Sequence, residues 1–458
     1  MSSQNAWATF PSALNTALAK YKIPAASVSA LVIPLDSNTA LLSHLSEKPR
    51  NPASVMKLLT TYAALDILGP AHTWKTQYYI NGSLENGILD GDLVIKGGGD
   101  PYLVQEQLWL HLAELRAKGL KKISGNLLID NSTFDLPMFD RAKFDQQPTR
   151  LYNVGANASM VNFNASRFRF QPDDGKIKIL LDPPMHNVVV NNQLKAAKGK
   201  CRGAQSGWSI DFVEKKGTAY VALTGKYRSR CGTYDLRRSV LKADAYLFGL
   251  FTYLWRSLGG EFSGGFAQAE VKEEAKPYYT GSAKTLAEVI NGTNKYSNNL
   301  LARQLLLAIG QHNFPEGTSV ADGVNSVRAW LKDKNISMPN LFLENGAGLS
   351  RSISLSAKGL GHLLVHAHHS AYQPEFLSSF SLTSVDGTMR KRLKALKLGG
   401  KARLKTGYIK GVRSLAGYVR ANSGKDYAVV LLIQDKKVNF SNGNQIQDVL
   451  IKWVLEKG

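Results

Sequence analysis

The two ends of this 458-residue chain carry matching halves of one structural pattern. Apolar residues at helical spacing over 7–22 precede two strand-like runs, at 26–34 and 39–45. At the other end the order is reversed, because strands over 414–434 precede a helix over about 444–455. Strands and helices must bury their apolar faces against a partner. We therefore expect the two ends to fold together as one α/β domain.

The sequence between the two ends has a different character. From 71 to 264, short β-rich runs alternate with Gly, Asn and Asp turns, and a single clear helix over 105–117 interrupts them. A chain of this length exceeds what one hydrophobic core organises. We expect a discontinuous domain made of 1–70 and 265–458. The β-rich region is inserted into it as two nested subdomains, one of them over about 96–168.

The charge of the chain limits its partners. Lys and Arg number 57 against 35 Asp and Glu, which leaves a net charge of +22. Such a surplus favours nucleic acid, anionic lipid or an anionic cell-envelope polymer, although a generally solvated basic surface also accounts for it. We expect no nucleic-acid partner, because the sequence lacks zinc-finger, helix-turn-helix and RNA-binding aromatic motifs. One cluster of cations comprises Arg390, Lys391, Arg392, Lys394 and Lys397.

The cysteines and the N-terminus give information on whether the protein is exported or remains in the cytosol. Cys201 and Cys231 are the only cysteines, and no histidine lies between them to complete a zinc site. We expect a disulfide if the protein is exported and two free thiols if it is not. No stretch approaches the roughly 18 apolar residues of a membrane span. The N-terminus lacks a basic region followed by an apolar one, so the protein is either cytosolic or has lost an export signal.

Ser54 and Lys57 are the first candidates for chemistry. They stand three residues apart at the start of a predicted helix that continues through 58–68. Residues at this spacing share a helix face, so a hydroxyl and an amine come within reach of each other. A lysine partly stripped of water can take the proton of a serine nucleophile. A helix cap would also explain the serine, and Ser239 and Lys242 repeat the spacing.

Two further motifs distinguish between these pairs. Ser297-x-Asn299 lies in a loop that enters a helix, and Lys405-Thr406-Gly407 lies on a strand ahead of the C-terminal hairpin. Ser-x-Asn is common and could be a helix cap, but Lys-Thr-Gly occurs once. Only the first Ser-x-x-Lys pair precedes both motifs with each in a suitable structural context.

In this order of motifs the chain resembles the penicillin-binding proteins and serine β-lactamases. The resemblance implies acyl transfer by Ser54, which attacks the carbonyl between two D-alanines. Lys57 would accept the proton of the serine. Ser297 and Lys405 would pass a proton to the leaving amine.

The same resemblance implies the substrate-binding groups. Asn299 would bond the backbone of the substrate, and Thr406, with the lysine before it, would bind the terminal carboxylate. Gly407 would let the substrate approach the strand without a side chain in the way. The oxyanion hole would use the backbone N–H groups of Ser54 and Tyr408.

The separation of Ser54 from Ser297 is far longer than in most β-lactamases and simple carboxypeptidases. It resembles the class C low-molecular-mass penicillin-binding proteins, the D-alanyl-D-alanine carboxypeptidase/endopeptidase family S13. The stretches 97–101, 344–351 and 386–389 resemble this family too. The fold is then expected to be a penicillin-binding/β-lactamase-like transpeptidase domain, with an antiparallel sheet flanked by helices and a large β-rich insertion.

The resemblance carries further expectations. Arg351 would bind the carboxylate of a diaminopimelate residue of the substrate. The stretch 152–157 departs from the family pattern, so we assign no substrate contacts to it. We expect a periplasmic enzyme without a cofactor, acting on peptidoglycan stem peptides, inhibited by β-lactams and associated peripherally with the envelope. The alternatives are a β-lactamase or a non-catalytic envelope-binding protein.

A histidine cluster is the most metal-like feature of the sequence. It comprises His362, His366, His368 and His369. No glutamate stands between the first two, as a zinc peptidase would require. We expect a helix face and no metal site.

Overall fold

The computed structural model describes residues 10–37, 39–396 and 398–458. The expected helix over 7–22 begins outside these residues, and its described part is α1 (Ser12–Lys20). Within the described residues, no helix is both long enough and apolar enough to cross a membrane.

The chain folds into two compact units. One is discontinuous and joins the residues up to His72 with those from Thr285 onward, and the other is Thr73–Lys284. In the first unit, a strand from the N-terminal part lies antiparallel to one from the C-terminal part, with Val28 opposite Ile433. The two ends of the chain therefore share one sheet.

That sheet has the strand order β16-β17-β18-β19-β1-β2. Its strands are β16 (Ser381–Leu382), β17 (Ala402–Ile409), β18 (Val412–Arg420), β19 (Asp426–Gln434), β1 (Val28–Pro34) and β2 (Leu42–His44). β19 and β1 are apolar at almost every position, because helices cover both faces of the sheet.

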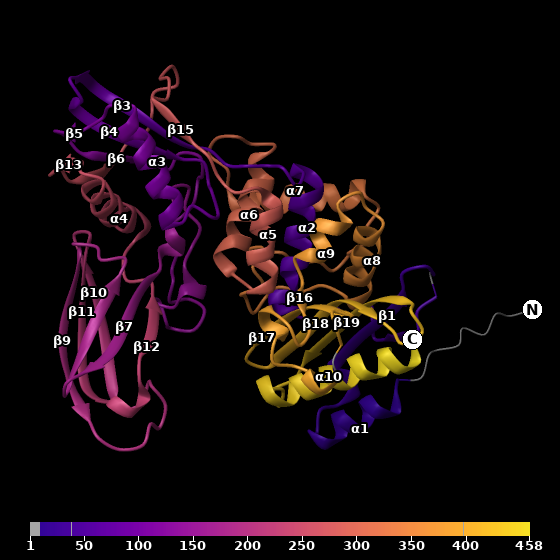
Figure 1. The fold of residues 1–458 in the computed structure, drawn as a ribbon. Coiled ribbons are helices and arrows are strands. Elements are labelled where there is room, and N and C mark those ends of the chain that lie inside the picture. Colours follow the sequence, from indigo (N-terminus) through magenta and orange to yellow (C-terminus); the bar gives the residue numbers. More distant parts are fainter. Residues whose placement is uncertain (1–9, 38, 397) are drawn as a thin grey trace, which may run out of the picture. The chain divides into compact units, whose positions relative to one another are not determined.

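Helices lie on both sides of this sheet (Figure 1). α1 and α10 (Phe440–Lys457) cover one face, and Leu14, Leu450 and Leu431 belong to the shared core there. The other face carries α2 (Lys57–Leu68), α5 (Leu286–Lys295), α6 (Asn299–Gln311), α7 (Val320–Asp333), α8 (Ala357–His368) and α9 (Gln373–Ser378).

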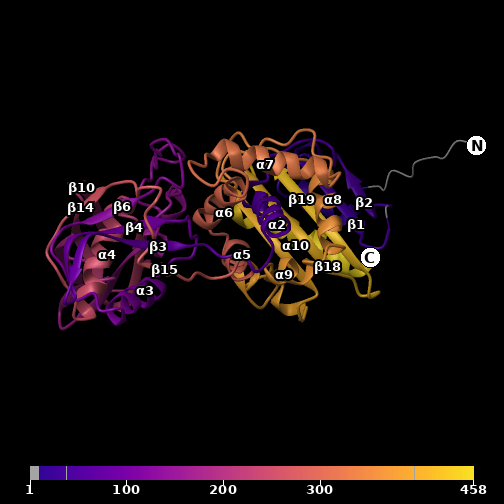
Figure 2. The ribbon, with the colours of Figure 1, turned by 90° about the horizontal axis from the view of Figure 1, so that it is seen from above.

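α2 lies at the centre of the second helical layer (Figure 2). It contacts α5, α6, α7, α8 and α9, and its residues Lys57 to Leu65 are all buried. A helix that is apolar all round is stable only when enclosed on all sides. Lys57 is therefore placed at the start of a helix that is enclosed along most of its length.

The second unit contains a larger sheet and two smaller ones, with a disulfide between Cys201 and Cys231. The larger sheet comprises β3 (Thr76–Glu85), β4 (Ile88–Gly97), β5 (Lys122–Ile123), β6 (Leu127–Asp130), β13 (Glu261–Phe262), β14 (Phe266–Gln268) and β15 (Tyr279–Gly281). This unit extends beyond the expected boundary at residue 264, because β14 pairs with β6 and β15 with β3.

The smaller sheets of the second unit pack around a shared aromatic core that includes Phe168 and Phe170. Their strands are β7 (Ser166–Asp173), β8 (Lys176–Asp182), β9 (Val188–Ala197), β10 (Trp208–Lys215), β11 (Thr218–Arg228) and β12 (Tyr234–Arg238). The helices α3 (Gln105–Ala117) and α4 (Ala243–Ser257) complete the unit. A nested subdomain over 96–168 remains a prediction.

Candidate active site

Ser54 lies in a 3₁₀ turn, Ala53–Met56, rather than in the α-helix that was expected to begin with it. The turn leads directly into α2 at Lys57. Ala53 has a φ of +47°, and the backbone of Gly348 packs against its carbonyl group. Such a conformation is strained for a residue with a side chain and persists where the surroundings enforce it. The turn holds Ser54 in place ahead of the helix.

Lys57 connects three parts of the site. Its Nζ donates to Ser54 Oγ at 3.1 Å and to Asn299 Oδ1 at 2.7 Å, and it also donates to the carbonyl of Ala347. The side chain is completely buried. Burial, and after it the positive charges of Lys405 and Arg303, hold the pKa of Lys57 well below its usual value. A neutral amine in contact with the serine hydroxyl can accept its proton.

Ser297 and Lys405 form the second hydroxyl–amine pair. Lys405 Nζ donates to Ser297 Oγ at 2.8 Å and to the carbonyl of Thr406 at 2.9 Å. Burial, and then the charge of Arg413, lower the pKa of Lys405 to about 7. Asn298 caps α6 by accepting from Leu300 N at 3.0 Å, so the hydroxyl of Ser297 is not used as the helix cap.

The edge of β17 beside these pairs is open to a ligand. The carbonyl of Ala402 accepts from Thr383 N at 3.0 Å, on the β16 side of the strand. The backbone N–H and C=O groups of every second residue in a strand point to the same edge. Those of Thr406 and Tyr408 therefore point to the same edge of β17 as the carbonyl of Ala402, the edge on which β16 lies. They lie beyond the end of β16, which pairs only with Leu404 and Arg403. This edge can pair with an extended substrate.

Gly407 has a packing role in addition to the expected one, which stays a prediction. A Cβ atom there would lie 2.1 Å from Ser414 Oγ, 2.7 Å from the Pro52 carbonyl and 3.0 Å from the Ser54 nitrogen. The missing side chain therefore lets β17 approach the turn that carries the nucleophile. The backbone nitrogen of Ser54 therefore lies close to the segment of β17 that continues into Tyr408, and an oxyanion hole made of their N–H groups stays a prediction.

A cavity of about 620 Å³ opens at this site. Ser54, Ser297, Thr406 and Tyr408 line it, together with Thr388, whose hydroxyl accepts from Thr406 Oγ1 at 3.0 Å. Lys57 and Lys405 are fully buried, and the described lining of the cavity includes the hydroxyl-bearing residue of each pair but neither lysine.

Arg351 lies outside the described lining of the cavity. Its guanidinium donates to the carbonyl of Lys410 at 2.8 Å, in the turn between β17 and β18, and its side chain is exposed. The structure thus brings the three motifs together but does not bring Arg351 to their cavity. Thr388 and Arg413 were not predicted. Thr388 lies in the family-like stretch 386–389, whereas the contact of Arg413 with β17 follows from the register of the hairpin.

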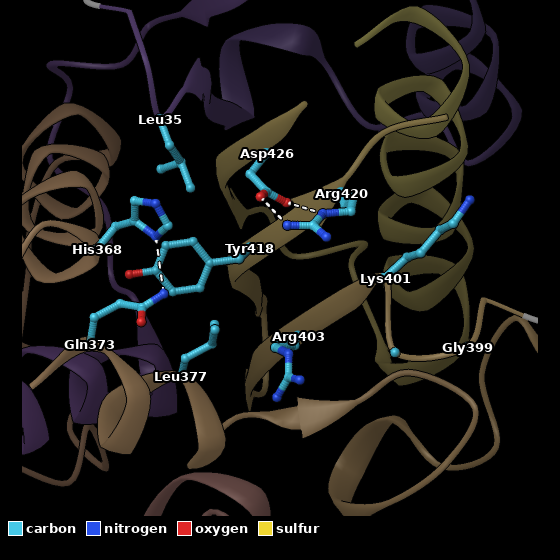
Figure 3. A pocket seen from close by; sticks show the side chains of 11 residues that line it. Leu35, His368, Gln373, Leu377, Gly399, Lys401, Arg403, Tyr418, Arg420 and Asp426 are labelled. Carbon is cyan, nitrogen blue, oxygen red and sulfur yellow. Dashed lines mark hydrogen bonds and ion pairs between the residues drawn. The ribbon is translucent and has the colours of Figure 1, made fainter. Parts of the chain in front are cut away.

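A second hollow, of about 340 Å³, lies near the start of β17 (Figure 3). Tyr418 and Arg403 line it, and Figure 3 shows Arg420 paired with Asp426 beside them. Its described lining includes none of the predicted site residues.

The histidines of α8 have separate partners. His366 is hydrogen-bonded to the Tyr62 hydroxyl at 2.7 Å, and His369, which follows α8, to the carbonyl of Leu35 at 3.0 Å. His368 lies beside the second hollow. Across the described ranges, no group of three or more His, Cys, Asp or Glu side chains is placed to hold a metal ion.

The fold and the paired hydroxyl–amine site define an acyl-serine enzyme of the penicillin-binding type. The model of the D-Ala-D-Ala carboxypeptidase 3 (S13) family matches residues 11–457, and the chain belongs to this family. The D-alanyl-D-alanine carboxypeptidase DacB of Haemophilus influenzae is 27% identical over 390 residues, covering 83% of this chain and 80% of that protein. The D-alanyl-D-alanine carboxypeptidase of an Actinomadura species is also 27% identical, covering 82% and 71%.

Solved structures share this fold. The crystal structure of penicillin-binding protein 4 from Haemophilus influenzae matches with a TM-score of 0.81 at 23% identity, over 97% of this chain and 99% of that one. That protein has also been crystallised with a β-lactam. The predicted fold class is confirmed, as is the prediction of a serine-type D-Ala-D-Ala peptidase.

Proposed function

We propose that this serine DD-peptidase cleaves the D-Ala-D-Ala bond of peptidoglycan stem peptides through an acyl-enzyme on Ser54, and that β-lactams acylate the same serine. One observation carries the proposal. Two hydroxyl–amine pairs, Ser54 with Lys57 and Ser297 with Lys405, meet at one cavity. Each pair joins a partly buried hydroxyl that lines the cavity to a fully buried amine of lowered pKa. This arrangement suits one pair to attack and the other to protonate the leaving group.

The acylation step follows from the geometry. Lys57 takes the proton of Ser54 as Ser54 Oγ attacks the carbonyl carbon, and the N–H groups of Ser54 and Tyr408 stabilise the oxyanion. The C–N bond breaks when the amine of the departing D-alanine receives a proton from Ser297, which Lys405 replenishes. The carboxylate of that D-alanine bonds to Thr406. Water then hydrolyses the ester by the reverse sequence of proton transfers.

The periplasm is the proposed compartment. The disulfide between Cys201 and Cys231 supports an oxidising environment. The net charge of +22 supports encounter with a polymer whose peptides carry carboxylates. A peripheral association with the envelope would rest on the same charge and would weaken with salt.

The test is acylation and turnover by the purified protein. Labelled penicillin should add one adduct, mapped to Ser54 by mass spectrometry, and a pentapeptide ending in D-Ala-D-Ala should lose its last residue. Ser54→Ala should abolish both. Ser239→Ala, which alters the other Ser-x-x-Lys pair, should abolish neither. An adduct that persists on Ser54→Ala would refute the assignment, and rapid turnover of a chromogenic cephalosporin would favour a β-lactamase.

A further inference from the structure

The cavity continues beyond the catalytic residues along a strongly basic wall. The cations that line it are Arg390, Lys391, Arg392 and Arg413, and its described lining includes no acidic residue. The first three follow the 3₁₀ turn Gly387–Met389, which carries Thr388. The basic wall therefore begins next to Thr388 and Thr406, which form the proposed cradle for the terminal carboxylate of the substrate.

Two of the four cations, Arg392 and Arg413, are buried and held in place by contacts within the protein. Arg392 donates from Nε to Asp448 at 3.0 Å and from a terminal nitrogen to Gln447 at 2.8 Å. Arg413 donates to the carbonyl of Gly407 at 3.1 Å, and its guanidinium faces the ring of Phe440 at 4.6 Å. Both side chains are more than nine-tenths buried. Both guanidinium groups are held in fixed positions, and that of Arg392 is ion-paired with Asp448.

Arg390 and Lys391 differ from these two because they are exposed. Among the described residues, neither side chain donates a hydrogen bond or forms an ion pair with a carboxylate. The nearby acids are already engaged, Asp386 with Lys295 and Asp448 with Arg392. Two cations that have no counter-charge among the described residues, next to the buried Arg413, create a positive potential that attracts an anion to this end of the cavity.

Their position indicates which part of a substrate they meet. On the proposed function, the departing residue lies between the Ser297–Lys405 pair and the cradle formed by Thr406 and Thr388. Whatever is attached to that residue extends toward Arg390 and Lys391. A cavity of about 620 Å³ lies within the range of roughly 300–1,000 Å³ that holds drug-sized ligands, so it has room beyond one alanine.

We propose that Arg390 and Lys391 bind a second carboxylate on the leaving-group side of the scissile bond. They would thereby select acidic leaving groups over neutral ones of equal size. In peptidoglycan, the acceptor peptide of a cross-link has free carboxylates that extend beyond the departing residue. The preference is a property of these two side chains and is separate from the attack by Ser54.

A matched pair of peptides tests the preference. The two are identical up to the penultimate D-alanine and end in D-Glu or in D-Gln, so that they differ in charge and hardly in size. For the wild type, kcat/KM should be about tenfold higher for D-Glu, which corresponds to about 1.4 kcal/mol. The double variant Arg390→Gln, Lys391→Gln should bring the ratio close to one, and added salt should reduce it in the wild type.

The control is Lys394→Gln, which removes an exposed cation from the next 3₁₀ turn, outside the described lining of the cavity. It should keep the wild-type ratio. A wild-type ratio near one, or a ratio unchanged in the double variant, would overturn the inference while penicillin labelling of Ser54 still upheld the proposed function. Loss of labelling in the wild type would overturn both.

Discussion

A Cβ atom on Gly407 would lie 3.0 Å from the backbone nitrogen of Ser54, although the two residues are far apart in the chain. The strand proposed to bind the substrate and the turn that carries the proposed nucleophile are therefore in direct contact. Because Tyr408 follows Gly407 in the strand, a change in this contact should change the distance between the backbone N–H groups of Ser54 and Tyr408, the proposed oxyanion hole. The glycine of the Lys-Thr-Gly motif thus has a structural role that can be separated from any role in admitting substrate.

Gly407→Ala should push the strand away from this turn. The nearest clash is with the side-chain oxygen of Ser414, which can rotate aside, but the clashes with the Pro52 carbonyl and the Ser54 nitrogen are with backbone atoms, so the oxyanion hole should widen. We expect the rate of acylation by penicillin to fall about 100- to 1,000-fold, comparable to the loss of one oxyanion donor. Gly265→Ala is the control, because a Cβ there meets only Asn126 Oδ1, at 3.6 Å. A Gly407→Ala enzyme with normal acylation would contradict the geometry.

The alkaline limb of the pH profile should report Lys405. In the proposed mechanism its protonated form supplies the proton for the leaving amine, so peptide turnover should fall as pH rises through about 7. Arg413 contributes to this low pKa by its charge. Arg413→Gln should therefore raise the pKa of Lys405 and move the alkaline limb of kcat/KM to higher pH. Arg420→Gln, on the same strand, should leave the limb in place.

The acid limb of the pH profile for acylation should depend on Asn299, the hydrogen-bond partner of Lys57. Asn299→Asp would put a negative charge against the amine and raise its pKa. Because acylation needs the neutral amine, labelling of Ser54 should slow at neutral pH and recover as pH rises. The measurement is the second-order rate constant for labelled penicillin across pH. The same exchange at Asn313, beyond the other end of α6, should have no such effect, and an unshifted Asn299→Asp profile would argue against Lys57 as the base.

That the three motifs meet at one cavity could be predicted from the sequence, because the proposed chemistry needs particular side chains at short spacings. Ser54 and Lys57 meet across a single turn, and this spacing survives the change from an α-helix to a 3₁₀ turn. The turn itself could not be predicted. It depends on a positive φ at Ala53, enforced by packing against Gly348, which is distant in the sequence.

The wall of the cavity was harder to predict for the same physical reason. Arg390 and Lys391 appeared in the sequence only as part of a basic cluster, and their neighbours in space come from β18 and α10. The end of the second unit was placed too early because β14 and β15 are short, and only pairing with distant strands reveals them. Local patterns predict elements, whereas long-range pairing decides which unit they join.

The disulfide between Cys201 and Cys231 should stabilise only the second unit. It closes a loop in which the residues are 30 apart in sequence, and cross-links of this kind typically contribute about 2–4 kcal/mol. Cys201→Ser should therefore lower the thermal transition of that unit, and a reductant should lower the wild type to the same temperature without affecting the variant. Penicillin labelling of Ser54 at 25 °C should keep its rate, because every residue of the proposed site belongs to the other unit. A variant that unfolds at the wild-type temperature would show that the bridge adds nothing to stability, and a variant that loses labelling would show that the two units depend on each other for catalysis.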